Sequence, residues 1–295
     1  PNVNVSSRGV NTLLSLIGDI DYSYDNTYLL NFTVRRDGSS KFLNNQWGTF
    51  PSIAAGWRAS ELSALQDIGW LTDLKIRGGY GTMGNQLNVD INNAYSLFGG
   101  SQQNSYYPID GAHNNVQQGF RQDRIGNPDA KWERIVDMNI GFDLAVLNGR
   151  LEVTADYYRK EVRDLLYNPA FPATAGAADV PFRNVASMRN QGVDLSLRHG
   201  ANLSDDLELN TQLTFTTYNN EILSVSEGAD YFSADARRFG VDIIRNEVGH
   251  PISSFYGYDI VGFWTEDQIA EVDDDYQEDM APGRFRYRDV NGDGR

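Results

Sequence analysis

The chain has 295 residues, of which 40% are hydrophobic and 22% charged, a composition typical of a folded protein. Its formal net charge of -15 argues against a nucleic-acid partner, because proteins that bind phosphate backbones concentrate Lys and Arg on one face. The chain has no cysteine, which excludes a disulfide framework and a cysteine zinc site.

The dominant pattern along the chain is period-two alternation of apolar and polar residues, which sorts side chains to opposite faces of a strand. It is clear in YLLNFTVR at 28–35 and in LELNTQLTFTT at 207–217. The predicted strands, in chain order, are 11–24, 27–36, 49–58, 71–84, 132–147, 150–163, 187–199 and 207–219. Most are about ten residues or longer, which exceeds the ~5 to 6 residues usual in soluble sheets and is close to what crosses a bilayer at a tilt. Since no apolar run approaches the roughly 20 residues of a membrane helix, a membrane location would require a barrel.

The connections between these segments are alternately short and long. Asp25-Asn26-Thr27 and the residues 147–150 are of hairpin size, and 200–206 is a slightly longer turn. The connections 85–130 and 220–251 are long and rich in Asn, Gln, Gly and Tyr. Short turns at one end and long loops at the other are typical of outer-membrane barrels.

Two further features bear on this interpretation. The link 59–70 is not a short turn, and we expect one helical turn at 61–66. Aromatic residues gather near the predicted strand ends, as they do at the two interfaces of a bilayer, although aromatics are enriched in any β protein. These aromatics are Tyr22, Tyr24, Tyr28, Trp57, Trp70, Trp132, Tyr157, Tyr158 and Tyr218.

Several strings of residues, in this order, resemble the SusC/RagA family of TonB-linked outer-membrane proteins. They are YLLNFTVRRDGSSKF at 28–42, FPSIAAGW at 50–57, LKIRGGYGTMGN at 74–85, WE at 132–133, DYY at 156–158, NQGVD at 190–194, PISSFYGY at 251–258 and DVNGDG at 289–294. Each string alone is a weak signal, but their order and spacing cover nearly the whole chain.

The resemblance implies an all-β fold, namely part of an antiparallel transmembrane β-barrel. About eight strands lie in this chain, against the roughly 22 of a complete TonB-dependent transporter. The region 220–295 is then mainly exterior loop, and we expect the plug domain and the final strands to lie outside the chain. The location implied is the outer membrane of a Gram-negative bacterium of the Bacteroidota.

The resemblance also implies a function, TonB-dependent uptake of a nutrient without chemical change. The partners implied are a SusD-like surface lipoprotein, the TonB complex acting through the plug region, outer-membrane lipid, and an oligosaccharide cargo. An oligopeptide cargo remains an alternative, as do a non-transporting β-barrel adhesin or pore and a soluble β-sandwich that binds or hydrolyses sugar.

One face of the strands is expected to line the barrel lumen. Its candidate residues are Asn31, Thr33, Arg35, Glu152, Thr154, Asp156, Glu208, Asn210 and Gln212. They would line the path of the cargo, or they would only contact water or the plug.

The long loops supply candidate cargo contacts, because sugar C–H faces stack on aromatic rings while hydroxyls bond to amides and carboxylates. The candidates are Tyr106, Tyr107, His113, Asn114 and Asn115 in the first long loop, with Tyr231 and Phe232 in the second. The alternative is that these residues pack loop against loop or contact a lid lipoprotein.

The string DVNGDG matches the first half of a calcium loop, in which oxygens at alternate positions converge on the ion. Its candidate ligands are Asp289, Asn291 and Asp293, for a structural calcium ion. A metal-free turn built on Asn-Gly and Asp-Gly is the competing interpretation, and no other cofactor is expected.

Catalytic patterns are poor. His113, His199 and His250 are the only histidines, and HExxH, GxSxG and phosphate-binding glycine loops are all missing from the sequence. Pairs of carboxylates occur, but 40 acidic residues produce such pairs by chance. The sequence therefore predicts no catalytic residues and no enzyme.

Overall fold

The computed structural model describes residues 9–101, 103–109, 111, 116–168, 176–204, 206–225, 230–233, 237–238, 241–273, 276–290 and 292. The chain divides into two compact units. Unit 1 comprises Pro1–Phe232 with Glu247–Ile252, and unit 2 comprises Ser233–Asn246 with Ser253–Arg295. Within the described ranges, no helix is long and apolar enough to span a membrane.

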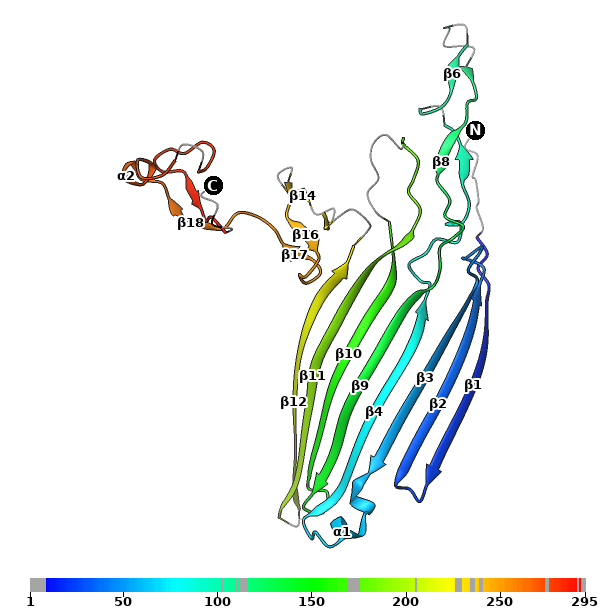
Figure 1. Cartoon of the computed structure of the whole chain (residues 1–295), viewed down its shortest axis with the longest axis vertical. Helices are drawn as coiled ribbons and strands as arrows, with labels where there is room; N and C mark the ends of the chain where they lie inside the picture. The colour runs from blue at the N-terminus through cyan, green and yellow to red at the C-terminus, as the bar shows by residue number, and fades with distance from the viewer. Residues whose placement is uncertain are drawn as a thin grey trace. The chain divides into compact units, whose positions relative to one another are not determined.

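Unit 1 is built on one sheet of eight long strands, whose neighbours are all antiparallel (Figure 1). Their spatial order is β1-β2-β3-β4-β9-β10-β11-β12. The strands are β1 (Leu13–Tyr24), β2 (Tyr28–Ser39), β3 (Trp47–Arg58), β4 (Leu71–Asn85), β9 (Glu133–Val146), β10 (Leu151–Tyr167), β11 (Arg183–Ser204) and β12 (Leu207–Ser224). Each of the eight predicted segments overlaps one of them.

The strand ends differ from the predicted ones, most at β11 and β12. The predicted turn 200–206 is wrong, because β11 continues to Ser204 and β12 begins at Leu207. Residues 220–224 continue β12 and are not loop, since Asn190 pairs with Asn220 and Arg189 with Glu221. Around Asn219 and Asn220 both faces are polar, so the alternation is interrupted while the backbone ladder goes on.

Two tight turns depend on left-handed backbone. Asp25 and Asn26 have φ of 50° and 52°, as a two-residue turn matching the strand twist requires. In the second turn, Leu147, Asn148 and Gly149 have φ of 57°, 60° and 79°. Asp, Asn and Gly tolerate this region at little cost, whereas Leu does not.

The link between β3 and β4 contains a 3-10 turn, η1 (Ala59–Glu61), and one α-helical turn, α1 (Ser63–Gln66). The helical turn expected at 61–66 is therefore present, beginning two residues later. Figure 1 shows α1 at the end of the sheet that carries the short turns. The link is tied to the next turn, because the Leu147 N–H donates to the Trp70 carbonyl at 2.8 Å.

A proline ends the pairing between β3 and β4. Pro51 has no N–H to donate, and the β3–β4 register stops at Ser52 opposite Gly81, while β3 goes on pairing with β2 as far as Trp47. The side chain of Phe50 packs where the two strands separate. A Cβ on Gly84 would lie 2.1 Å from Phe50 Cζ, so only glycine leaves room for the ring there.

Around Phe50 lies the main buried cluster of the described residues, at the loop end of the sheet. The Phe42 and Phe50 ring centroids lie 5.3 Å and 5.7 Å from that of Trp132. The Trp132 indole N–H donates to the Gln46 carbonyl at 2.9 Å. The cluster consists of Phe42, Phe50, Val89, Ala130, Trp132 and Leu166, with Phe182 packed against it.

The long loop 86–132 is held to this cluster by a buried asparagine. Asn93 is only 1% exposed; its amide nitrogen donates to the Phe182 carbonyl at 3.1 Å, and its oxygen accepts from the Phe182 N–H at 2.7 Å. Asn127 donates to the same carbonyl at 2.9 Å. Two chain segments far apart in sequence are thereby joined.

The remaining strands are short. Unit 1 also contains β5 (Leu97–Gly99), which pairs with β8 (Arg121–Arg124), and β6 (Tyr107–Pro108), which pairs with β7 (Val116–Gln117). The other short elements are β13 (Tyr231–Ser233), β14 (Arg237–Arg238), β15 (Val241–Asp242), β16 (Ile244–Glu247), β17 (Ser254–Phe255), β18 (Ile260–Phe263), α2 (Glu266–Ile269) and β19 (Phe285–Tyr287).

Candidate functional site

The large sheet has one apolar and one polar face. Residues directly opposite each other share a face, so the register carries the apolar face from Ile20 and Phe32 to Ile53, Tyr80 and Met138. Its side chains are widely exposed, with Ile20 at 65%, Leu213 at 63% and Phe215 at 61%. An exposed apolar face of this extent requires a nonpolar surrounding, which is what a bilayer supplies.

Aromatic and charged residues mark the two ends of the apolar face. At the turn end, Tyr24 lies opposite Tyr28, and Tyr28 lies opposite Trp57. At the loop end the same face becomes charged: Glu161 accepts hydrogen bonds from Arg159 and Arg163, and Arg189 forms an ion pair with Glu221. A belt of apolar side chains between an aromatic and a charged border is the pattern of a membrane-facing barrel wall.

The polar face carries a network of side-chain hydrogen bonds across strands. On β1 and β2, Asn31 donates to Asp19 at 3.1 Å and to Asp21 at 2.8 Å. Arg35 donates across to Ser15 of β1 at 3.2 Å and, within its own strand, to Asp37 at 2.8 Å. Cross-strand pairs of this kind stabilise a sheet and fix the orientation of its side chains.

The strongest contact on this face joins three strands. Arg77 of β4 lies between Asp143 of β9 and Asp156 of β10. Its Nε is 3.0 Å from Asp143 Oδ2, and its Nη1 and Nη2 are 2.6 Å and 2.7 Å from the two Asp156 oxygens. One guanidinium thus uses its fork of donors on two carboxylates.

Beside this contact the polar face is hollowed. A depression of about 530 Å³ is lined by the small residues Ala54 and Gly56, with Asp21 and Asn31 among its walls and Lys75 and Arg77 opposite. Small side chains on β3 create the depth, while the flanking strands supply the charges.

The structure places the nine lumen candidates together on this polar face. Asn31 and Thr33 share a hydrogen bond, as do Glu208 and Asn210, and Asp156 binds Arg77. Glu152 lies opposite Arg198, which in turn lies opposite Gln212. That this face lines a lumen remains a prediction.

The loop candidates are not brought together as one site. Tyr107 is exposed on β6, while Phe232 packs its ring against Tyr167 at 4.6 Å between centroids. Phe232 therefore contacts the end of β10, and its part in cargo binding or in loop packing stays a prediction. Tyr106 is half-buried and Tyr231 is exposed, and His113, Asn114 and Asn115 lie outside the described residues.

The candidate calcium loop is described only in part. Asp289 Oδ1 accepts the N–H of Gly292 at 2.6 Å, which closes a turn, while Asn291 and Asp293 lie outside the described residues. No group of three metal-ligating side chains occurs in the part of the chain that the structure describes. A structural calcium ion therefore stays a prediction.

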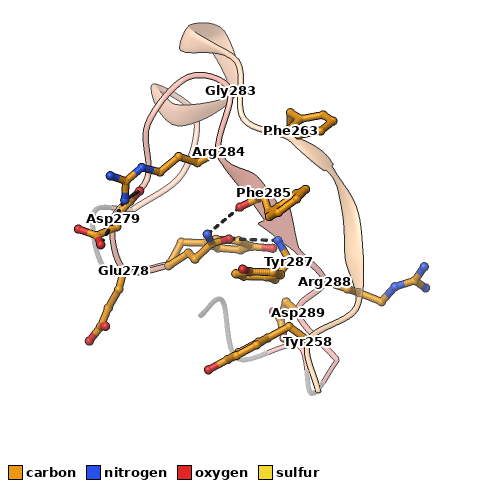
Figure 2. Close-up of a pocket in the computed structure, with 12 residues that line it drawn as sticks. Tyr258, Phe263, Glu278, Asp279, Gly283, Arg284, Phe285, Tyr287, Arg288 and Asp289 are labelled. Atoms are coloured by element: carbon orange, nitrogen blue, oxygen red, sulfur yellow. Dashed lines mark hydrogen bonds and ion pairs between the residues drawn. The ribbon is translucent and has the colours of Figure 1, made fainter. Parts of the chain in front are cut away.

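Unit 2 contains a groove that the sequence analysis missed (Figure 2). Its volume is about 720 Å³, and its lining includes the rings of Tyr258, Phe263, Phe285 and Tyr287. Tyr258 stacks on Tyr287 at 4.7 Å, and Phe263 stacks on Phe285 at 5.3 Å between centroids. The signal available in the sequence was the two-residue spacing of Phe285 and Tyr287, but nothing there indicated that β18 would be their partner.

A family model described as "TonB dependent receptor-like, beta-barrel" matches residues 1–292. The chain belongs to this family. As a segment of a receptor barrel it is not an enzyme, and its place is the outer membrane, as the sequence predicted. The two-faced sheet agrees with this assignment.

Individual relatives assign this TonB-dependent receptor segment to the SusC/RagA type. The chain is 32% identical over 292 residues to the TonB-dependent receptor SusC of Bacteroides thetaiotaomicron, covering 96% of this chain and 27% of SusC. It is 32% identical over 270 residues to the TonB-dependent receptor P39 of Formosa agariphila, covering 90% and 24%. The receptor segment therefore spans roughly a quarter of the length of these relatives.

Solved structures give the same result. The RagAB peptide transporter matches with a TM-score of 0.74 and 27% identity, over 86% of this chain and 26% of that one. The RagAB peptide importer in its closed-closed state matches with a TM-score of 0.75 and 26% identity, over 94% and 28%. The described fold of the receptor segment is thus that of an open part of such a barrel.

Proposed function

We propose that the chain forms part of the wall of an outer-membrane importer that takes up oligosaccharides by TonB-dependent transport. The observation that carries the proposal is the two-faced sheet: its apolar side fits lipid, and its polar side carries the Arg77–Asp143–Asp156 contact and the depression beside it. Fixed polar groups on the inner wall of a wide barrel would give the plug and the cargo a hydrated surface to contact.

Two parts of the proposal go beyond the family. A glycan cargo is supported by the aromatic groove of unit 2, whereas RagAB is named a peptide transporter. A SusD-like surface lipoprotein is proposed as the partner, in keeping with the SusC/RagA type. An oligopeptide importer is the second candidate because of its likeness to RagAB, and a non-transporting pore or adhesin would present the same wall.

Uptake by cells separates these functions. The parent receptor is expressed in a host that lacks it, with and without a functional TonB complex, and the cells are supplied with fluorescent oligosaccharides or fluorescent oligopeptides. We expect receptor-dependent accumulation of oligosaccharide that stops when TonB is removed. Accumulation of peptide alone would establish the second candidate, and entry without TonB would establish a pore. Co-purification of a SusD-like lipoprotein tests the partner.

A further inference from the structure

The groove of unit 2 is formed by a two-stranded sheet with aromatic residues on both strands. In β18 and β19, Ile260 lies opposite Tyr287 and Phe263 opposite Phe285. Figure 2 shows the rings of Phe285, Tyr287 and Tyr258 one beside the other along the groove. The two paired strands, together with Tyr258 just before β18, therefore present a continuous strip of rings.

These rings remain open to solvent even though they stack on each other. Tyr258 is 82% exposed, Phe263 61% and Phe285 47%, whereas Tyr287 is half-buried, so three of the four rings are largely open to solvent. Exposed aromatic patches in a hollow mark binding surfaces more often than isolated exposed rings do. A ligand with a flat apolar face could therefore stack on the rings of this strip.

Polar groups border the strip. Arg284 Nη1 pairs with Asp279 Oδ2 at 3.2 Å, and the exposed carboxylate of Glu278 lies next to this pair in the chain. Figure 2 shows Arg284 and Asp279 at one side of the rings. A ligand lying on the rings would therefore find both donors and acceptors of hydrogen bonds along one border.

The outer edge of β19 is already occupied by a side chain. The Gln277 amide nitrogen donates to the Phe285 carbonyl at 2.9 Å, and its oxygen accepts the Tyr287 N–H at 3.1 Å. These are the backbone groups that an added peptide strand would have to use. Recognition of an extended peptide by strand addition at β19 is therefore blocked.

The remaining chemistry favours a sugar chain. Pyranose rings present flat C–H faces that stack on aromatics, and their hydroxyls both donate and accept, as Arg284, Asp279 and Glu278 require. A lipid chain would leave these charges unsolvated, and the carboxylates would repel a nucleic acid.

We infer that the strip formed by Tyr258, Phe263, Phe285 and Tyr287 binds the sugar rings of a neutral oligosaccharide. This site is additional to the loop residues singled out from the sequence. It rests on the proposed function for the identity of the cargo as a glycan, but binding at the groove can be measured without transport.

The test uses the full-length parent receptor in detergent and an array of neutral α-glucan, β-glucan, mannan and xylan oligosaccharides. The tightest-binding oligosaccharide is then titrated calorimetrically against the variants Tyr258→Ala and Phe263→Ala. Loss of one stacking ring is expected to weaken binding roughly 3- to 12-fold. Tyr258→Phe keeps the ring and is expected to bind within about 2-fold of the wild type, given the weak net contribution of one exposed hydroxyl.

Phe255→Ala is the matched control, because Phe255 is an equally exposed aromatic of unit 2 that does not line the groove. Its binding is expected to be unchanged. Wild-type affinity in both groove variants would overturn the inference, and so would a receptor that binds none of the glycans. If the variants weaken binding as expected while cellular uptake proves independent of TonB, the groove stands and the proposed transport function fails.

Discussion

Arg77 and Asp156 bind each other across an intervening strand. Arg77 lies on β4 and Asp156 on β10, with β9 between them, yet Nη1 and Oδ1 are 2.6 Å apart. Asp143 of β9 contacts the same guanidinium, so one side chain links three strands. A substitution at Arg77 therefore tests how much these contacts between three strands stabilise the sheet.

Replacing Arg77 by methionine keeps the length of the side chain but leaves two neighbouring carboxylates without their cation. We expect Arg77→Met to lower the free energy of unfolding by about 1–3 kcal/mol, because hydrogen bonds to charged groups are lost and the like charges repel. Chemical denaturation of the parent receptor in detergent measures this change.

Arg121→Met is the control for this variant, since Arg121 pairs with Asp123 in a loop where both side chains are well exposed. Its effect should not exceed about 0.5 kcal/mol. The double variant Arg77→Met with Asp143→Asn should recover part of the loss, because one carboxylate then remains. Equal losses in the Arg77 and Arg121 variants would contradict the role given to Arg77.

The buried Asn93 provides a second test. Asn93→Ala leaves the N–H of Phe182 without its partner, at a cost of about 1–3 kcal/mol for a buried donor, and removes one of the two donors to the Phe182 carbonyl. We expect the loop 86–132 to become sensitive to limited proteolysis. Asn92→Ala is the adjacent control, because the Asn92 side chain is exposed. If both variants are cut at the same rate, Asn93 does not hold the loop.

The turn at Leu147 contains avoidable strain. Leu147 has a φ of 57°, which costs a residue with a Cβ roughly 1–2 kcal/mol, whereas its side chain is half exposed and contributes little packing. We expect Leu147→Gly to raise stability by about 0.5–1 kcal/mol once the entropy cost of glycine is included.

The comparison for this turn is Asn148→Gly, which should change stability by only a few tenths of a kcal/mol because Asn already tolerates the left-handed region. Leu147→Val should be destabilising, since a β-branched residue fits that region worst. The three variants are ranked by their refolding yield into detergent micelles. A lower yield for Leu147→Gly than for the wild type would refute the proposed backbone strain at Leu147.

Asp90 should make the stability of the long loop depend on pH. The Asn92 N–H, which donates to its carboxylate at 2.9 Å, and secondarily the Arg124 side chain hold the pKa of Asp90 below its ordinary value. A lowered pKa in the folded state means that the stabilisation is present above the unfolded pKa and is lost as the pH falls through the folded pKa.

The measurement is the difference in unfolding free energy between the wild type and Asp90→Asn. We expect this difference to be largest at about pH 7, above the unfolded pKa, and to shrink as the pH falls through the lowered pKa of the folded state. Arg124→Gln removes only the weaker partner and should keep part of the dependence. A difference that is constant across this range would rule out the role of Asp90.

The sequence predicted the sheet well because alternation is a local property. On β12, for example, the polar neighbours Gln212 and Thr214 indicate that Leu213 points to the opposite, apolar face. The same signal fails near Asn190 and Asn220, where both faces are polar and the strands are joined by backbone pairing and by polar contacts such as the Arg189–Glu221 ion pair. It was for this reason that the end of β12 was placed too early, at residue 219.

The sites depend on contacts that local patterns do not contain. Arg77, Asp143 and Asp156 come from three strands, and their meeting depends on the exact register of β4, β9 and β10. The same holds for the groove, where Phe263 meets Phe285 only because β18 pairs with β19. The composition of the loops therefore could not indicate which aromatic rings meet in the groove, because that depends on the pairing of short strands.

The register of the large sheet has a consequence for the order in which it folds. Three strand pairs, β1–β2, β9–β10 and β11–β12, are joined by turns of a few residues and can zip up from their own ends within microseconds. Pairing of β4 with β9 must first close the whole segment 86–132, which carries a larger entropy cost. We therefore expect hairpins to form first and the β4–β9 seam to form last, with the Asn93 contact, which secures the segment, forming alongside it.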